Sequence, residues 1–262
     1  MGDSLSLEGR VAFITGSSKG LGGAMATAMA EHGAHVVVNS RSQEGVDAKV
    51  TALTGAGHGA SGVAFDVADT EAGVAAIARV IEEQGRLDIL VNNAGESILG
   101  EFIEYSIDLF RQHLDTHVTG AFALSREAAR HMVERGSGRI INISSILGGR
   151  IAMAGGPAYA AAKAGLEGLT RAMAAELGPK GVLCNAIAPG YFHTNIGGFM
   201  KENEPLPEAT KDFYNFSISH NPLGRWAKPA EIGDLAVYLA SDASSYVNGS
   251  IITIDGGLTT MQ

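Results

Sequence analysis

Residues 11–22 read VAFITGSSKGLG, and this stretch decides the fold. It joins an apolar run, Val11–Thr15, to the glycines Gly16, Gly20 and Gly22, and a helical pattern begins at about residue 20. Glycine lets the backbone turn tightly and approach a phosphate, and the start of a helix offers free N–H groups and a positive dipole end. The stretch therefore predicts a strand, turn and helix that bind the pyrophosphate of a dinucleotide. A tight turn that binds nothing is the alternative.

The same alternation of apolar runs and helical patterns continues along the chain. It predicts a single α/β domain over residues 1–262, a Rossmann-type doubly wound parallel sheet of about seven strands with helices on both faces. The expected strands are Val11–Thr15, His35–Asn39, Val63–Phe65, Ile89–Val91, Arg139–Ile143, Leu183–Ile187 and Ile251–Ile254. The expected helices cover about 20–32, 44–54, 70–84, 106–134, 157–178 and 229–240. One irregular stretch, 195–221, is expected to be a substrate loop.

Polar or turn-forming residues follow nearly every expected strand. They are Thr15-Gly16, Arg41, Asp66, Asn92-Asn93, Ser144-Ser145 and Pro189-Gly190, in the order of the strands. Ligands of open α/β sheets bind outside the carboxyl ends of the strands. We therefore expect these residues to share one site.

Composition narrows the classes of partner. The 262 residues are 45% hydrophobic and 18% charged, which suits a globular core, and the formal net charge of −9 argues against nucleic acid as a partner. The one cysteine, Cys184, cannot form an internal disulfide, and no window approaches the ~18 apolar residues of a membrane span. With no signal-peptide layout at the N-terminus, we expect a cytoplasmic protein that binds a small molecule and neither nucleic acid nor membrane.

The end of the second strand indicates which dinucleotide would bind. It reads Val-Asn-Ser40-Arg41, without the acidic residue that accepts from the ribose 2′-OH of NAD, and Lys19 adds a second cation nearby. A guanidinium suits a 2′-phosphate, so NADP(H) is the preferred cofactor, and NAD(H) stays possible. The alternative is that Arg41 is a solvated surface charge.

Across nearly its whole length the chain resembles the short-chain dehydrogenase/reductase family. The matching residues are Thr15-Gly-x-x-x-Gly-x-Gly22, Asp66, Asn92-Asn-Ala-Gly95, Ser145, Tyr159-x-x-x-Lys163, Asn185, Pro189-Gly190 with Thr194, and Asp255-Gly256-Gly257. The resemblance implies nicotinamide chemistry on one doubly wound domain. The stretches Pro189-Gly-Tyr-Phe-x-Thr194 and Arg225-Trp226 resemble sugar-acid and polyol members such as gluconate 5-dehydrogenase. The overall pattern is also similar to 3-oxoacyl carrier-protein reductases.

By the same resemblance, Asp66 and Val67 would border the adenine, and Asn93 to Gly95 the adenosine side. The alternative for Asn92 to Gly95 is an Asn-rich turn that only closes the fourth strand, and the segment can have both roles. The full expected cofactor site is Gly16, Ser18, Lys19, Gly20, Leu21, Gly22, Ser40, Arg41, Asp66, Val67, Asn93, Ala94, Gly95, Tyr159, Lys163, Pro189, Gly190, Phe192 and Thr194.

Tyr159 and Lys163 are the expected centre of the chemistry. Four residues apart on a helix, they lie on one face, and a cation there favours the phenolate of a tyrosine whose free pKa is about 10. Tyr159 would then exchange a proton with the substrate oxygen, while Ser145 donates a hydrogen bond to that oxygen and Lys163 holds the nicotinamide ribose. Ser144 is the competing serine, and Ser145 is preferred because Ser145-Ile-Leu-Gly148 fits the Ser-x-x-Gly pattern of the family.

One residue departs from the family pattern. His117 stands where the family has an asparagine that supports a water-linked proton path. Its imidazole could relay protons and add a pH dependence near neutrality, or it could be a packed structural residue. His113 and His117 also form His-x-x-x-His, but the glutamate of zinc proteases is absent, so we expect no metal.

These observations predict an oxidoreductase that interconverts a ketone and a secondary alcohol. Its substrate pocket would lie near Glu96, Ser97, 146–153, 191–193 and 195–221. A nucleotide-binding regulator or scaffold with little turnover is the alternative. Family resemblance also implies a homotetramer, with contacts through the helices at 106–134 and 157–178 and through the C-terminal segment.

Overall fold

The computed structural model describes residues 4–194 and 208–260, and its seven strands form one parallel sheet in the order β3-β2-β1-β4-β5-β6-β7. This confirms the doubly wound α/β architecture expected from the alternating pattern. The strands are β1 (Val11–Ile14), β2 (His35–Ser40), β3 (Ala60–Ala64), β4 (Ile89–Asn92), β5 (Gly138–Ile143), β6 (Val182–Pro189) and β7 (Ile251–Ile254).

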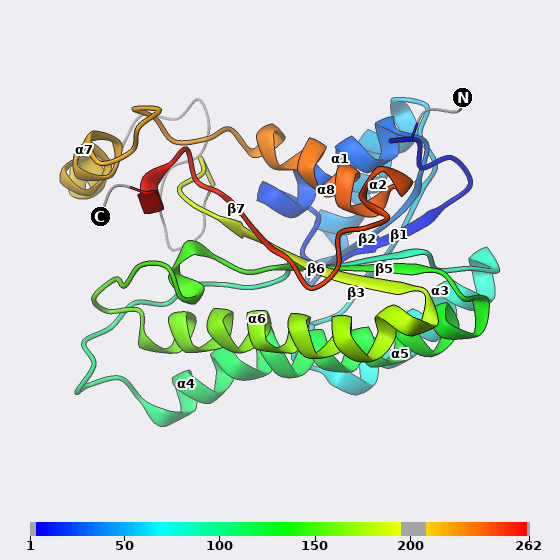
Figure 1. Cartoon of the computed structure of the whole chain (residues 1–262), viewed down its shortest axis with the longest axis horizontal. Coiled ribbons are helices and arrows are strands. Elements are labelled where there is room, and N and C mark those ends of the chain that lie inside the picture. Colours follow the sequence, from blue (N-terminus) through cyan, green and yellow to red (C-terminus); the bar gives the residue numbers. More distant parts are fainter. Residues whose placement is uncertain (1–3, 195–207, 261–262) are drawn as a thin grey trace.

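Helices cover both faces of the sheet (Figure 1). One face carries α1 (Gly20–Glu31), α2 (Gln43–Gly55) and α8 (Gly233–Ala240), and the other carries α3 (Thr70–Gln84), α5 (Gly120–Arg135) and α6 (Pro157–Leu177). Side chains of β1 alternate between the two cores, because Ile14 packs with Met29 on the first face and Phe13 packs with Ile77 on the second. A strand buried on both faces is therefore continuously apolar, as residues 11–14 are.

The order of the strands creates the place for a site. The chain runs from β1 outward to β2 and β3 and then returns to β4, on the other side of β1. The loops after β1 and β4 therefore lead away in opposite directions, and a crevice forms between them at the carboxyl ends of these two strands. The helix α7 (Lys211–Ser219) lies at the end of the molecule drawn at the left of Figure 1.

The bounds expected for one strand and one helix were wrong. The third strand is Ala60–Ala64 rather than Val63–Phe65, because it pairs only with β2 at the edge of the sheet, where half-buried small residues suffice. The helix expected over 106–134 is α4 (Ile107–Leu114) and α5, separated by a π-helical turn over Asp115–Thr119. A π turn keeps the apolar periodicity nearly intact, so the pattern did not reveal it.

The stretch 195–221 was expected to be irregular, and its described part is mostly helical. Residues 208–210 form a 3-10 turn and α7 follows directly, while 195–207 lie outside the described residues. The helix forms because Phe213 and Tyr214 face the indole of Trp226, which donates a hydrogen bond to the Ser217 hydroxyl at 2.6 Å.

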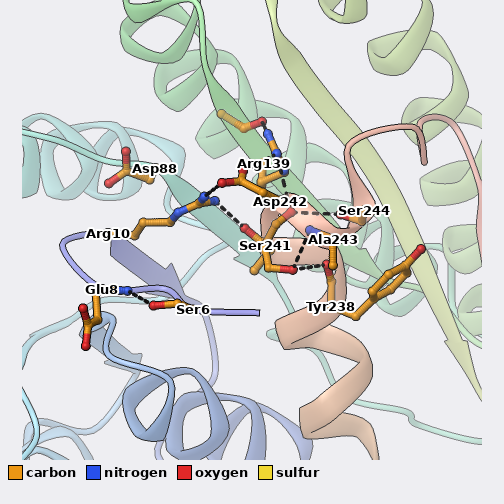
Figure 2. A network of polar contacts seen from close by, with 12 residues as sticks. Ser6, Glu8, Arg10, Asp88, Arg139, Tyr238, Ser241, Asp242, Ala243 and Ser244 are labelled. Atoms are coloured by element: carbon orange, nitrogen blue, oxygen red, sulfur yellow. Dashed lines mark hydrogen bonds and ion pairs between the residues drawn. The ribbon is translucent and has the colours of Figure 1, made fainter. Parts of the chain in front are cut away.

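The opposite, amino edge of the sheet is held by charged groups (Figure 2). Arg10, just before β1, pairs with Asp242 at 2.7 Å, and Arg139 of β5 reaches the same carboxylate at 3.3 Å. Arg10 also donates to the carbonyl oxygen of Ala240 at 2.9 Å. Asp88 accepts from the Val11 N–H at 2.9 Å. These bonds join the N-terminal segment, two inner strands and the end of α8, away from the crevice.

Candidate active site

A cleft of about 1200 Å³ lies at the carboxyl ends of the strands. Every residue expected from the sequence to bind the cofactor or take part in the chemistry lines it, although they come from eight separate segments of the chain. The sheet brings them together because parallel strands end at the same edge.

The glycine turn after β1 is shaped to receive a phosphate. Gly16 and Gly20 have φ values of 62° and 60°, in the left-handed region that favours glycine. A Cβ on Gly22 would lie 2.3 Å from the Gly16 carbonyl oxygen, so no side chain fits there. The N-cap residue of α1, Lys19, makes no side-chain capping bond, and the first turn contains no acidic residue. The backbone N–H groups at the start of α1 are thus left for an external anion, and the turn fits a dinucleotide pyrophosphate.

Two asparagines hold this turn in place. Asn93 donates from Nδ2 to the carbonyl oxygens of Thr15 at 2.9 Å and Gly16 at 3.1 Å. Asn39 accepts from the Gly16 N–H at 3.2 Å. Asn93 therefore has the structural role considered as an alternative, while it also lines the cleft. Asn39 was missed, and its only signal was a polar residue inside the apolar strand HVVVNS.

Arg41, which follows β2, lines the cleft and forms an ion pair with Glu96. The Arg41 guanidinium lies 3.8 Å from a carboxylate oxygen of Glu96, and its side chain is 70% exposed. The other oxygen of Glu96 accepts from Gln112 of α4 at 3.0 Å. Sequence reasoning placed Glu96 in the substrate pocket and did not link it to Arg41, because the two residues are far apart along the chain.

Ser145, Tyr159 and Lys163 meet at one wall of the cleft. The Ser145 hydroxyl accepts from the Leu147 N–H at 3.2 Å and forms a side-chain hydrogen bond with Tyr159. The Lys163 ammonium lies 5.4 Å from the centre of the Tyr159 ring and donates to the Ile143 carbonyl oxygen at 2.7 Å. Helix α6 positions both side chains, since residues four apart share a helix face.

The pKa values of this group differ from the sequence expectation. Burial raises the pKa of Tyr159 to about 12, and the hydrogen bond from Ser145 opposes this only partly. Burial also lowers the pKa of Lys163 to about 7, so near neutrality its amine carries only part of a charge. The expected stabilisation of the phenolate by Lys163 is therefore outweighed by desolvation.

The neighbouring serine occupies a different environment. Ser144 is almost fully buried and donates to the Glu167 carboxylate at 2.9 Å. Arg150 contacts the same carboxylate oxygen at 2.8 Å. Ser144 thus belongs to a buried polar group beneath α6, whereas Ser145 is bonded to Tyr159.

His117 is buried within the π-helical turn, next to Tyr159. Their rings meet edge to face at 5.4 Å, and His117 Nε2 donates to the Glu96 carbonyl oxygen at 2.9 Å. Burial and the Lys163 charge hold the pKa of His117 well below its ordinary value, so the ring stays neutral near pH 7. Of the two alternatives considered for His117, a ring that titrates near neutrality and a packed structural residue, this lowered pKa favours the second.

A small cavity of about 10 Å³ lies behind this histidine. It is lined by Asn92, Thr116, His117 and Lys163, among others. Within the described part of the chain, His117 Nδ1 and Asn92 Oδ1 are buried without a hydrogen-bond partner. The volume approaches that of one water molecule, and polar walls are what a buried water requires.

No metal centre is formed by the two histidines. His113 bonds through both ring nitrogens, with the Leu109 carbonyl oxygen at 2.9 Å and the Ile98 N–H at 3.3 Å. Over residues 4–194 and 208–260, no three His, Cys, Asp or Glu side chains gather as metal ligands would. Over the same residues, no helix has the length and apolarity needed to cross a membrane.

The side of the cleft beyond Tyr159 is mainly apolar and aromatic. Tyr191 stacks on Trp226 at 5.5 Å and meets Phe213 edge to face at 5.3 Å, and Met153 and Leu147 line the same cleft. Arg225 directly precedes Trp226, in a stretch that resembles sugar-acid enzymes. Its guanidinium is bound to both oxygens of Glu231 at 2.7 Å, away from the lining of the cleft.

Known proteins match the chain over nearly its full length. The oxidoreductase UcpA of Salmonella typhimurium is 39% identical over 255 residues, which are 97% of this chain and 95% of that protein. Gluconate 5-dehydrogenase of Gluconobacter oxydans is 37% identical over 257 residues, or 98% and 97% of the two chains. A crystal structure of gluconate 5-dehydrogenase from Burkholderia cenocepacia, in complex with NADP and tartrate, superposes with a TM-score of 0.91 at 35% identity and covers 98% of each chain.

A family model described as enoyl-(acyl carrier protein) reductase matches residues 16–259. This range contains the glycine turn, the serine–tyrosine–lysine group and the last strand. Similar proteins whose names state an activity include an oxidoreductase, a gluconate 5-dehydrogenase and a 3-oxoacyl carrier-protein reductase. The chain is therefore an oxidoreductase of the short-chain dehydrogenase/reductase family.

Proposed function

We propose that the protein is an NADP(H)-dependent oxidoreductase that interconverts a ketone and a secondary alcohol, with Tyr159 as the acid and base. One observation carries this proposal. The hydrogen-bonded pair of Ser145 and Tyr159, with Lys163 beside it, lines the same cleft as a glycine turn whose N–H groups suit a pyrophosphate.

The bound nicotinamide would supply or accept the hydride at the carbonyl carbon. The chain's own residues handle the proton and the developing charge. The Tyr159 hydroxyl donates its proton to the substrate oxygen during reduction, and the Ser145 hydroxyl stabilises the charge on that oxygen. Burial raises the pKa of Tyr159 to about 12, so near neutrality the hydroxyl keeps the proton that reduction of a ketone requires it to donate.

His117 and the small cavity support a route for replacing that proton. We propose that one water occupies the cavity and donates to Nδ1 of His117, which is free to accept because Nε2 holds the hydrogen bonded to the Glu96 carbonyl. The same water would contact Lys163. His117 would thus be a neutral hydrogen-bond acceptor in the path and would not change charge.

Arg41 supports the choice of NADP(H). Ser40 is the last residue of β2 and Arg41 follows it, so the end of this strand carries no carboxylate. A similar enzyme from Burkholderia cenocepacia was crystallised with NADP. Replacing Arg41 by Asp should reverse the preference, because a carboxylate accepts from a ribose 2′-OH and repels a 2′-phosphate. Equal affinity ratios for NADPH and NADH in Arg41→Asp and the wild type would contradict this assignment.

The wall beyond Tyr159 supports a substrate with an apolar or ring-shaped portion next to its carbonyl. Among the described residues, the cations that line the cleft are Lys19, Arg41, Lys49 and Lys163, all on the expected cofactor side or at the reacting centre. The substrate panel should therefore contain cyclic and aryl ketones beside keto acids related to gluconate, the substrate named for one relative.

The deciding experiment is NADPH consumption with this panel, measured for the wild type and Tyr159→Phe. We expect the wild type to reduce at least one ketone. Tyr159→Phe should still bind NADPH but reduce none of them. Tight NADPH binding with no turnover on any ketone would favour the regulator or scaffold.

We also propose a cytoplasmic homotetramer. Exposed apolar side chains near α4 and α5, namely Phe102, Ile103, Ile107 and Phe122, support contacts through this side of the molecule. Light scattering would give the mass of a tetramer, and a mass of 27.1 kDa would contradict the proposal.

A further inference from the structure

The ion pair between Arg41 and Glu96 crosses the cleft above the glycine turn. Arg41 follows β2, Glu96 follows β4, and β1 lies between these strands in the sheet. The turn that begins at Gly16 continues directly from β1, and all three residues line the same cleft. A contact that joins the loops after β2 and β4 must therefore pass over the turn after β1.

Glu96 is the anchored partner of this pair. Its side chain accepts from Gln112 at 3.0 Å, and its backbone carbonyl accepts from His117 Nε2 at 2.9 Å. Its side chain is 34% exposed, against 70% for Arg41. The guanidinium thus reaches across the cleft to a carboxylate whose position is set by α4 and the π-helical turn.

We propose that Glu96 is a specificity-determining residue, which holds Arg41 across the cleft and so weakens the preference for a 2′-phosphorylated dinucleotide. This rests on the proposed cofactor. A 2′-phosphate bound by Arg41 would compete with the Glu96 carboxylate for the charge and the position of the guanidinium, which now lies 3.8 Å from that carboxylate. A cofactor without the 2′-phosphate gains nothing from freeing Arg41.

The expected effect is modest because both side chains are partly exposed. Ion pairs of this kind correspond to about a 1.4- to 5-fold change in an equilibrium constant. Glu96→Gln should therefore bind 2′-phospho-ADP-ribose about 1.4- to 5-fold more tightly, with little change for ADP-ribose. The difference should shrink at 1 M NaCl, where the screening length is about 3 Å.

Calorimetric titration of these two nicotinamide-free ligands measures the effect without relying on turnover. Glu101→Gln is the matched control, since it removes the same charge from an exposed position of the same segment and does not line the cleft. Its affinity ratio should equal that of the wild type. An equal gain in Glu101→Gln would show a general effect of net charge and overturn the proposal.

A second variant separates release of Arg41 from direct repulsion by Glu96. In an Arg41→Gln background, Glu96→Gln should no longer improve the binding of 2′-phospho-ADP-ribose relative to ADP-ribose. The same gain in both backgrounds would overturn the proposal. Failure of the wild type to bind either ligand would instead contradict the proposed cofactor site, so the two failures are distinguishable.

Discussion

Replacing Gly95 by alanine tests the placement of His117 against the turn after β4. A Cβ at this position would lie 2.1 Å from Cε1 and 2.6 Å from Nδ1 of the imidazole, whereas carbon atoms in contact are about 3.5–4.0 Å apart. The ring cannot swing aside freely, because Nε2 is bonded to the Glu96 carbonyl and the ring edge meets Tyr159.

Overpacking of a well-packed site costs about 1–3 kcal/mol. For a chain of this size we therefore expect Gly95→Ala to lower the melting temperature by about 2–12 °C. Urea unfolding followed by circular dichroism gives the free energy directly. Gly55→Ala is the control, since its Cβ would meet nothing within 4 Å and Gly55 is an exposed residue at the end of α2.

The double variant decides whether His117 is the cause. In a His117→Ala background the Gly95→Ala substitution should cost less than about 0.5 kcal/mol, because the colliding ring is gone. The cost of His117→Ala itself cancels in this comparison. An unchanged cost in the two backgrounds, or a Gly95→Ala protein as stable as the wild type, would refute the reasoning.

Three further predictions concern ionisable side chains. Asp242→Asn should destabilise the fold by about 1–2 kcal/mol in urea unfolding, because it weakens the ion pair of the buried Arg139, whereas the exposed Asp108→Asn should cost less than about 0.5 kcal/mol. Burial lowers the pKa of Lys163 to about 7, so above pH 7 the unfolded wild-type chain binds a proton that the folded protein lacks, and the free energy of unfolding of the wild type rises with pH. The stability advantage of Lys163→Met over the wild type should therefore be larger at pH 7 than at pH 9 and fall by about 1.4 kcal/mol for each pH unit between them. A difference in unfolding free energy that does not change with pH would contradict this. His117→Asn should leave the shape of the pH–rate profile between pH 6 and 8 unchanged, because burial keeps the pKa of the imidazole well below that range; loss of an inflection near pH 6.5 would contradict it.

Much of the fold could be predicted because the sheet is parallel and buried on both faces. Such strands are nearly continuous apolar runs, and residues 11–14 are an example. Edges and interruptions left weaker signals. The strand Ala60–Ala64 contains Ala, Ser and Gly, and it forms because β2 offers an unpaired edge, which is a tertiary effect.

The site residues could be predicted from spacing, but their interactions could not. Tyr159 and Lys163 four residues apart indicate a shared helix face, yet nothing in the sequence measures how strongly burial opposes their charges. Arg41 follows β2 and Glu96 follows β4, and the two residues come together because the sheet places these strands on either side of β1. Desolvation and contacts between distant loops arise from the fold, so they require the structure.

The measurement that tests the central claim most directly is a single-turnover reaction of NADPH with a ketone substrate, compared between the wild type and Tyr159→Phe. Removing only the phenolic oxygen should leave NADPH affinity within about two-fold and lower the rate of NADPH oxidation by at least about 10²-fold, the smallest contribution usual for a general acid. A variant that binds NADPH normally and still reduces the ketone at the rate of the wild type would contradict the assignment of Tyr159 as the proton donor.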